Sequence, residues 1–191
     1  MTEPTVRGYM ILGCFDYIDT FEPALRERVY ATLPSDGCRS RESYDQMQWY
    51  PVDHCSDLYR GIVSLHGDDE AKAREALLGC GKFIAHAATN TFLRLLMRIM
   101  TPRVFARKAP DFWARDSRCG RMETDTSQLG DRRLIVRLHD IGAFAHTAPV
   151  AAGFGAFALT ACGVKDLSVK ISDWSLATPA PSDVDIEMSW S

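Results

Sequence analysis

The chain has 191 residues, with 22 Lys and Arg against 25 Asp and Glu, and 46% of its residues are hydrophobic. These values are ordinary for a globular protein, and they exclude a mainly disordered, collagen-like or low-complexity chain. The length fits a single domain over 1–191, which we expect to consist of a helical part at 1–100 and a sheet-and-helix part at 101–191.

Neither an export signal nor a membrane span is apparent in the sequence. The N-terminus lacks the basic, apolar and small-residue succession of a signal peptide. The longest weakly charged stretch, 141–164, is interrupted by Pro149 and several glycines. The 6 cysteines are widely spaced, without a Cys-x-x-Cys pair. We therefore predict a cytoplasmic protein with reduced thiols.

Charge is distributed unevenly along the chain. Residues 1–93 carry a net charge of -5, residues 94–137 carry +6, and residues 138–191 carry -4. The basic middle segment is interpreted either as a solvated face that complements the acidic flanks or as a contact surface for an anionic partner. Because no nucleic-acid-binding motif accompanies the basic segment, we expect no nucleic-acid partner.

Apolar spacing predicts a series of helices in the first half of the chain. Helices are expected at about 22–33 and 51–66, each bounded by proline or glycine. The strongest prediction is a long helix over 68–100, because the carboxylates at 68–70 suit the positive end of a helix dipole. The apolar segment 8–20 is ambiguous between helix and strand.

The second half combines short strands with one helix. Four runs alternate apolar and polar residues and predict strands at 121–126, 132–140, 167–171 and 184–188. A basic, aromatic connector is expected at 101–113 with a short helix at about 111–117, and a hairpin turn at 130–131. A helix of small residues is expected at 149–162, where Gly153 and Gly155 would let it sit close to the sheet. The order predicts an α+β fold with a small antiparallel sheet and a crossing helix.

Several residues, taken in order, resemble a paralogous protein family of myxobacteria that is distantly similar to heme-NO-binding (H-NOX) and 4-vinyl-reductase-like small-molecule-binding domains. The resemblance covers nearly the whole chain and is carried by Gly8, Trp49-Tyr50-Pro51, Leu78, Gly79, Gly81, Thr101-Pro102, Phe105, Pro110, Trp113, Gly120, Cys162-Gly163 and Trp190. It implies an H-NOX-like fold with an apolar ligand cavity between the helical part and the sheet part. It also implies a sensor rather than an enzyme.

The sequence departs from the heme-binding members of that family at two points. Those members use a histidine on a helix before a proline-containing connector, and a Tyr-x-Ser-x-Arg pattern for the heme propionates. Here the ligand position falls near Thr91 or Phe92, neither of which can ligate iron, and no Tyr-x-Ser-x-Arg occurs. We therefore expect no heme and predict no other cofactor.

The motifs of metal binding and covalent catalysis are also missing. No two histidines or cysteines have the short spacing of a zinc half-site. His54 and Cys55 are adjacent, so on a helix their side chains point about 100° apart, and no Gly-x-Ser-x-Gly elbow occurs. We expect neither a metal site nor catalytic residues. A Cys- or His-dependent enzyme is kept as a third hypothesis, and it predicts one thiol with fast alkylation at neutral pH.

Aromatic residues supply the candidate ligand site. They are either core residues or the lining of a mostly apolar pocket, and the pocket hypothesis names Trp49, Tyr50, Phe83, Phe92 and Trp113. The sequence therefore predicts a non-enzymatic sensor that holds an apolar small molecule between the long helix and the sheet.

Such a domain would act through a protein partner or by self-association. The alternative hypothesis is a protein-interaction module whose pocket has filled in. The basic segment would then contact an acidic partner through Arg103, Arg107 and Arg115.

Overall fold

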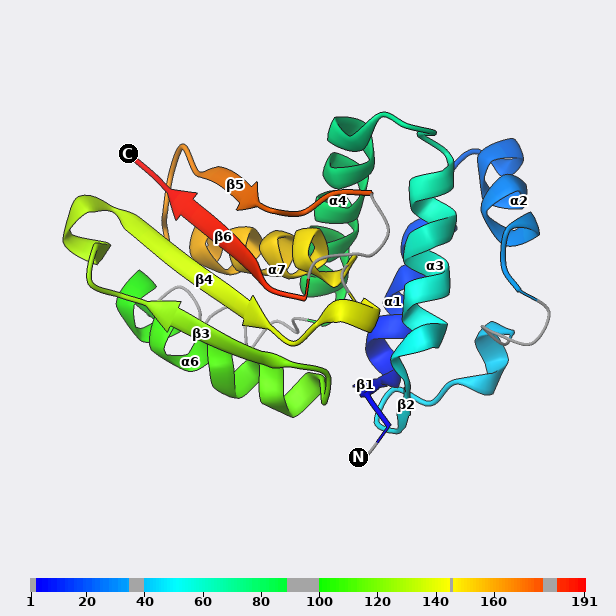
Figure 1. Cartoon of the computed structure of the whole chain (residues 1–191), viewed down its shortest axis with the longest axis horizontal. Coiled ribbons are helices and arrows are strands. Elements are labelled where there is room, and N and C mark those ends of the chain that lie inside the picture. The colour runs from blue at the N-terminus through cyan, green and yellow to red at the C-terminus, as the bar shows by residue number, and fades with distance from the viewer. Residues whose placement is uncertain (1–2, 35–39, 89–99, 145, 177–181) are drawn as a thin grey trace.

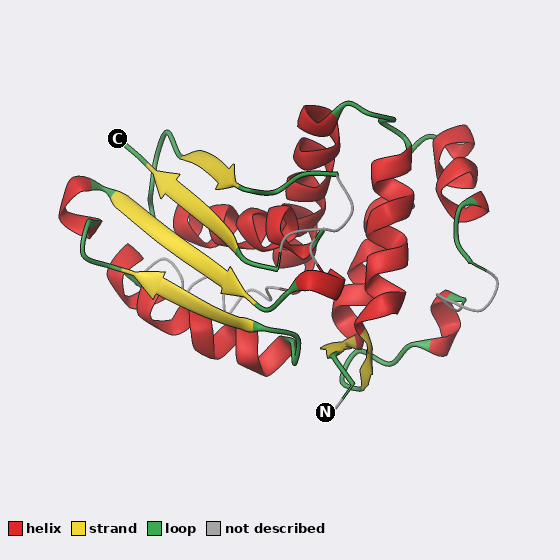
Figure 2. Cartoon of the chain, viewed as in Figure 1, coloured by secondary structure: helices red, strands yellow, loops and turns green. Residues whose placement is uncertain are grey.

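A helical part and a sheet part lie side by side in the computed structural model, which describes residues 3–34, 40–88, 100–144, 146–176 and 182–191 (Figure 1). The helical part contains β1 (Thr5–Arg7), α1 (Gly8–Ile18), α2 (Pro23–Ala31), β2 (Trp49–Pro51), α3 (Val52–Ser64) and α4 (Glu70–Ala88). The sheet part contains α6 (Pro102–Asp116), β3 (Arg121–Asp125), β4 (Arg133–His139), α7 (Thr147–Ala161), β5 (Ser168–Ser172) and β6 (Val184–Ser189). The predicted α+β fold is confirmed (Figure 2).

The predicted helices of the first half are present. The predictions at 22–33 and 51–66 correspond to α2 and α3, and the long helix begins as predicted, with α4 described to Ala88. The remainder of that prediction, 89–99, lies outside the described residues. The carboxylate of Asp69 accepts a hydrogen bond from the backbone N–H of Lys72 at 3.1 Å, which caps the start of α4. The Lys72 ammonium, 2.8 Å from the same carboxylate, and this backbone hydrogen bond together lower the pKa of Asp69.

The ambiguous segment 8–20 forms α1, a helix. Its buried residues include Ile11, Cys14, Phe15 and Ile18, a spacing that places one continuous stripe against the core. The two-stranded antiparallel sheet of β1 and β2 was not predicted, because three residues per strand are too few to show alternation. This small sheet fixes Trp49 and Tyr50 beside the start of α1.

The connector predicted at 101–113 is wrong, because these residues belong to α6. Pro102 occupies the first turn, where its missing N–H costs no hydrogen bond, and the Thr101 hydroxyl accepts a hydrogen bond from the Val104 N–H at 3.3 Å. The buried face of α6, which includes Phe105 and Ala106, packs on β3. Tertiary packing therefore overrides the proline at position 110.

The four predicted strands form an antiparallel sheet in the order β3-β4-β6-β5. Side chains alternate, so that one face is buried beneath α6 and α7 and the other carries charged pairs such as Arg133 with Glu187 at 2.6 Å. The predicted hairpin between β3 and β4 is present. Its turn is a 3-10 helix at Leu129–Asp131, followed by Arg132 in the left-handed region.

Helix α7 lies between α4 and the sheet. A Cβ atom built on Gly81 would approach the Val150 carbonyl oxygen to 2.0 Å, and one on Gly153 would approach the Leu78 carbonyl oxygen to 2.2 Å. Gly155 faces the Met188 side chain of β6, at 2.4 Å from the built Cβ. The expected close approach to the sheet is therefore right for Gly155, whereas Gly153 faces α4. The space between α4 and the sheet is filled by α7.

One connected hydrophobic core includes residues of both parts. The rings of Tyr59 on α3 and Phe144 before α7 stack with centroids 5.7 Å apart, and both side chains are buried. No helix in the described ranges is long and apolar enough to cross a membrane.

Candidate functional site

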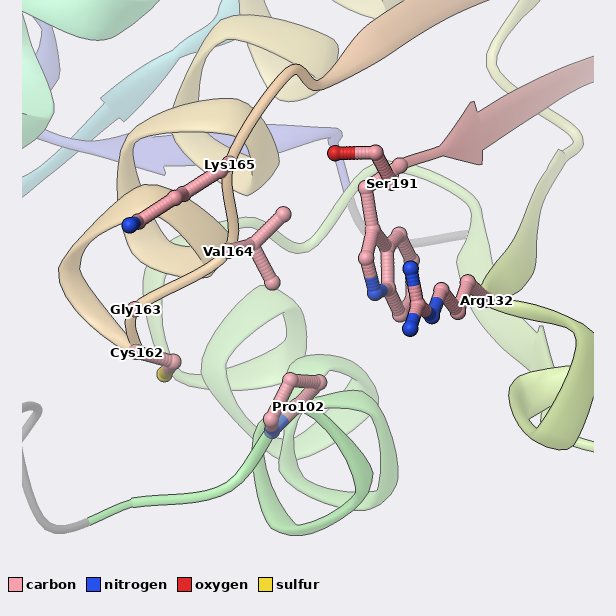
Figure 3. Close-up of a pocket in the computed structure, with 8 residues that line it drawn as sticks. Pro102, Arg132, Cys162, Gly163, Val164, Lys165 and Ser191 are labelled. Carbon is pink, nitrogen blue, oxygen red and sulfur yellow. The ribbon is translucent and has the colours of Figure 1, made fainter.

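A cavity of about 320 Å³ opens where the start of α6, the end of α7 and the adjoining ends of β4 and β6 meet (Figure 3). Its lining comes from segments that are far apart in the sequence: Pro102, Arg132, Cys162, Gly163, Val164, Lys165, Trp190 and Ser191. This volume is at the lower end of the range for small-molecule sites. Sequence patterns do not indicate this site, because no local pattern links its four distant segments.

The cavity combines an apolar wall with positive charge. Pro102, Val164 and the indole of Trp190 supply the apolar surface, while Arg132 and Lys165 supply two cations. In Figure 3, Arg132 extends toward the hollow from the β4 side, and Lys165 lies on the opposite side with its amino group directed outward. No Asp or Glu is among the described lining residues.

Backbone contacts hold the lining in place. The Trp190 N–H donates to the Arg132 carbonyl at 3.1 Å, which joins the end of β6 to the residue before β4. Arg132 has φ of 56°, a left-handed conformation that is uncommon for a residue with a side chain. On the other wall, the Val164 N–H donates to the Leu159 carbonyl at 3.1 Å and closes the end of α7.

The aromatic residues predicted to bind a ligand lie elsewhere. Arg7 and Arg118 each place a guanidinium over the Trp49 ring, at 4.1 and 4.0 Å from its centroid, and the Tyr50 hydroxyl accepts from the Asp45 N–H at 2.8 Å. Phe83 contacts Tyr17, and Trp113 is half-buried on α6. Phe92 lies outside the described residues. None of the four described residues lines the cavity, so their ligand role stays a prediction.

The three arginines predicted to contact a partner lie on the exposed side of α6. Arg115 forms two hydrogen bonds with the Asp116 carboxylate, at 2.9 and 2.7 Å. Arg103 and Arg107 form no ion pair within the described part of the chain. Two large apolar side chains are exposed on the same helix, Val104 at 47% and Phe112 at 37%.

Three buried thiols and one phenol converge in the helical part. The Sγ atoms of Cys14 and Cys55 are 3.8 Å apart, and Cys80 and Tyr59 lie beside them with no exposed surface. Burial raises the pKa of the Cys14 and Cys55 thiols well above the usual value, so both stay protonated near neutral pH. A protonated, buried thiol is a poor nucleophile. Among the described residues, no group of three or more His, Cys, Asp or Glu is arranged to hold a metal ion.

A helical part joined to a four-stranded antiparallel sheet, with α7 packed between α4 and the sheet, defines this α+β domain. Solved structures place it among H-NOX folds. The Fe(II) unliganded H-NOX protein from K. algicida superposes with a TM-score of 0.70 at 10% identity, covering 97% of this chain and 96% of that one. The S. oneidensis H-NOX protein in the Fe(II)NO state gives 0.63 at 9% identity, covering 97% and 99%. The IWP-051-bound H-NOX from Shewanella woodyi gives 0.59 at 13% identity, covering 96% and 94%.

This likeness is one of fold. No family model and no curated protein matches the sequence. The H-NOX-like fold implied by the sequence resemblance is therefore confirmed by structure, at identities too low to transfer a ligand.

The described lining of the cavity does not fit a heme, because it offers no histidine to the iron. None of the five histidines lines the cavity: His54 contacts the Tyr44 hydroxyl, His86 the Phe157 ring, His139 the Asp183 carboxylate and His146 the Trp174 ring, and His66 follows α3. Cys162 is the lining residue whose side chain is a common heme ligand, and burial raises the pKa of its thiol, which disfavours the thiolate. Thr91 and Phe92 lie outside the described residues.

Proposed function

We propose that this chain is a cytoplasmic, ligand-binding sensor domain of the H-NOX fold that works without heme and acts through a partner protein rather than as an enzyme. The observation that carries the proposal is a cavity with an apolar wall and no histidine, in a fold that matches H-NOX proteins over 97% of the chain. Raised pKa values of the described core thiols Cys14, Cys55 and Cys119 support the non-enzymatic role, since they disfavour thiolate nucleophiles.

The proposed ligand is a small molecule with an apolar body. Pro102, Val164 and the Trp190 indole form the apolar part of the lining, and a flat apolar group would lie against them. Because the cavity adjoins the first turn of α6, ligand binding would bear directly on the helix whose other side is exposed. A ligand in the cavity would thereby change how the exposed side of α6 binds a partner protein.

Native mass spectrometry of the purified protein, compared with its denatured mass, tests the proposal. We expect a bound molecule of small mass and no heme absorbance, and we expect added hemin to produce no stoichiometric complex with a sharp absorbance band. Stoichiometric hemin binding would overturn the heme-free function.

A protein-interaction module is the second candidate, and the exposed side of α6 favours it. Val104 and Phe112 are eight residues apart on one helix, and Arg103 and Arg107 lie beside Val104 without ion pairs in the described ranges. Exposed apolar side chains bordered by cations fit an acidic partner surface with an apolar centre.

Charge reversal tests this second function. The double change Arg103→Glu and Arg107→Glu should abolish capture of a partner that the wild-type protein retains, without changing the melting temperature. Arg28→Glu, an exposed arginine on α2, is the matched control. Equal capture by the double variant and the control would reject the α6 surface. Arg115 is left unchanged because its substitution would remove the hydrogen bonds to the Asp116 carboxylate.

A further inference from the structure

The charges around the cavity are unbalanced. Its described lining contains two cationic side chains, Arg132 and Lys165, and no acidic side chain, although the whole chain has a net charge of -3. Two carboxylates adjoin these cations in sequence: Asp131 precedes Arg132, and Asp166 follows Lys165 and accepts a hydrogen bond from the Ser191 hydroxyl at 2.7 Å. In the described part of the chain, neither lining cation forms an ion pair. Within the described residues, both cationic side chains at the cavity are therefore free of ion pairs with acidic side chains.

The start of α6 adds to this positive field. Pro102 is the first residue of a 15-residue helix, and it lines the cavity. The N-terminus of a helix carries a partial positive charge. The opposite effect at the end of α7 is reduced, because the N–H groups of Gly163 and Val164 bind the carbonyls of Thr160 and Leu159.

The two cations have different positions, and so we expect different roles. Arg132 extends toward the hollow, and its guanidinium can donate paired hydrogen bonds to a carboxylate or sulfonate. Its left-handed backbone and the hydrogen bond from Trp190 fix the base of this side chain beside the indole. Lys165 is exposed at the rim, where its charge attracts an anion without direct contact.

We propose that the cavity binds an organic anion with a flat apolar body, such as an aromatic carboxylate or sulfonate. The body lies against Trp190, Val164 and Pro102, and the anionic group is held by Arg132. Lys165 raises the affinity through its field. This inference rests on the proposed ligand-binding function and specifies the chemical class of the ligand.

A matched pair of fluorescent probes tests the inference on the whole protein. 8-Anilinonaphthalene-1-sulfonate carries an anionic group, and N-phenyl-1-naphthylamine has the same aromatic body without it. We expect one sulfonate probe to bind per chain, at least about tenfold more tightly than the neutral probe, since hydrogen bonds to charged groups are strong. Equal affinity of the two probes, or no saturable binding of the sulfonate, would overturn the inference.

Substitutions then locate the probe. Arg132→Gln should weaken binding of the sulfonate about tenfold or more and leave the neutral probe unaffected, while Arg132→Lys should restore part of the loss. Lys165→Gln should weaken binding only a few-fold, and the effect should vanish at high salt. Arg28→Gln is the charge-matched control, and melting temperatures verify folding. If Arg132→Gln binds like Arg28→Gln, the anion is not held by Arg132.

The two proposals can fail separately. A natural ligand found by native mass spectrometry that is uncharged would overturn the anion inference and leave the sensor function standing. Stoichiometric hemin binding would overturn the heme-free function, whatever the probes show.

Discussion

The hydroxyl of Tyr59 is buried in the helical core among weakly hydrogen-bonding thiols. Tyr59 is 0% exposed, and its hydroxyl has no hydrogen-bond partner among the described residues; the thiols of Cys14, Cys55 and Cys80 are its closest polar neighbours. Burial raises the pKa of this phenol well above its usual value. A buried hydroxyl without a partner lowers stability, because it loses water and gains nothing.

We expect Tyr59→Phe to raise the free energy of unfolding by about 1 kcal/mol, since the change removes only the unsatisfied hydroxyl. Urea unfolding measures the effect. Tyr17→Phe is the control, because the Tyr17 hydroxyl donates to the Ala76 carbonyl at 3.1 Å and its loss should lower stability by about 1 kcal/mol. A destabilised Tyr59→Phe would show that the thiols satisfy the phenol.

His146 makes stability depend on pH. Its ring lies 6.0 Å from the Trp174 ring, its Nδ1 atom is buried without a hydrogen-bond partner in the described structure, and burial and the charge of Arg60 lower its pKa below 6.5. Below pH 6.5 the unfolded chain therefore binds this proton more readily than the folded chain. Folding stability must then fall as the pH falls below 6.5.

We expect the free energy of unfolding to decrease between pH 7 and pH 5, and His146→Gln to reduce that slope. Asp69 and Asp183 have pKa values lowered from 3.8, so they change stability only near and below pH 3.8, outside the range from pH 5 to pH 7. Denaturant unfolding at several pH values measures the slope. Identical slopes for the variant and the wild type would assign the dependence to other groups.

At the scale of elements, the contact between α4 and α7 sets the distance between the helical part and the sheet part. Gly81 and Gly153 bring the backbones of these helices together, and Gly155 does the same for α7 and β6. Small residues at a helix crossing allow this approach because no Cβ atom separates the backbones. Any side chain at these positions must push α7 away from α4 or the sheet.

We expect Gly153→Ala to lower the free energy of unfolding by at least about 1–3 kcal/mol, because the new methyl group would overlap the Leu78 carbonyl. Gly130→Ala is the control, since a Cβ atom there meets nothing within 4 Å. Thermal unfolding compares the two. A Gly153→Ala variant as stable as Gly130→Ala would mean that α7 packs less closely than described.

At the scale of the whole molecule, the helical part and the sheet part share one core. The Tyr59–Phe144 stack and the insertion of α7 between α4 and the sheet connect residues 1–100 with residues 101–191. Parts that share buried surface unfold together when neither keeps a core of its own. The single domain predicted for 1–191 thus has a direct thermodynamic consequence.

We expect one cooperative unfolding transition, with coincident curves from far-UV circular dichroism, which reports the helices, and from tryptophan fluorescence. Trp174 and Trp190 report the sheet part, and Trp49 reports the helical part. Two separated transitions would instead divide the chain near residue 100.

Local sequence patterns were sufficient for most elements of this fold. Apolar residues alternate in β4 and β6, and proline or glycine marks the ends of α2 and α3. These patterns involve residues that are close in the chain, so the sequence alone predicts the elements. The α+β order and the H-NOX-like fold followed from these elements and from scattered residues in a consistent order.

Only the tertiary structure decided where the cavity lies. No sequence pattern connects the lining residues Pro102, Arg132, Val164 and Trp190. They come together only through the register of β4 with β6 and the packing of α7. Likewise, α6 became a full helix through packing on β3, which outweighs an internal proline. Elements follow from interactions between near neighbours, whereas a site made by four distant segments exists only after long-range packing has brought them together.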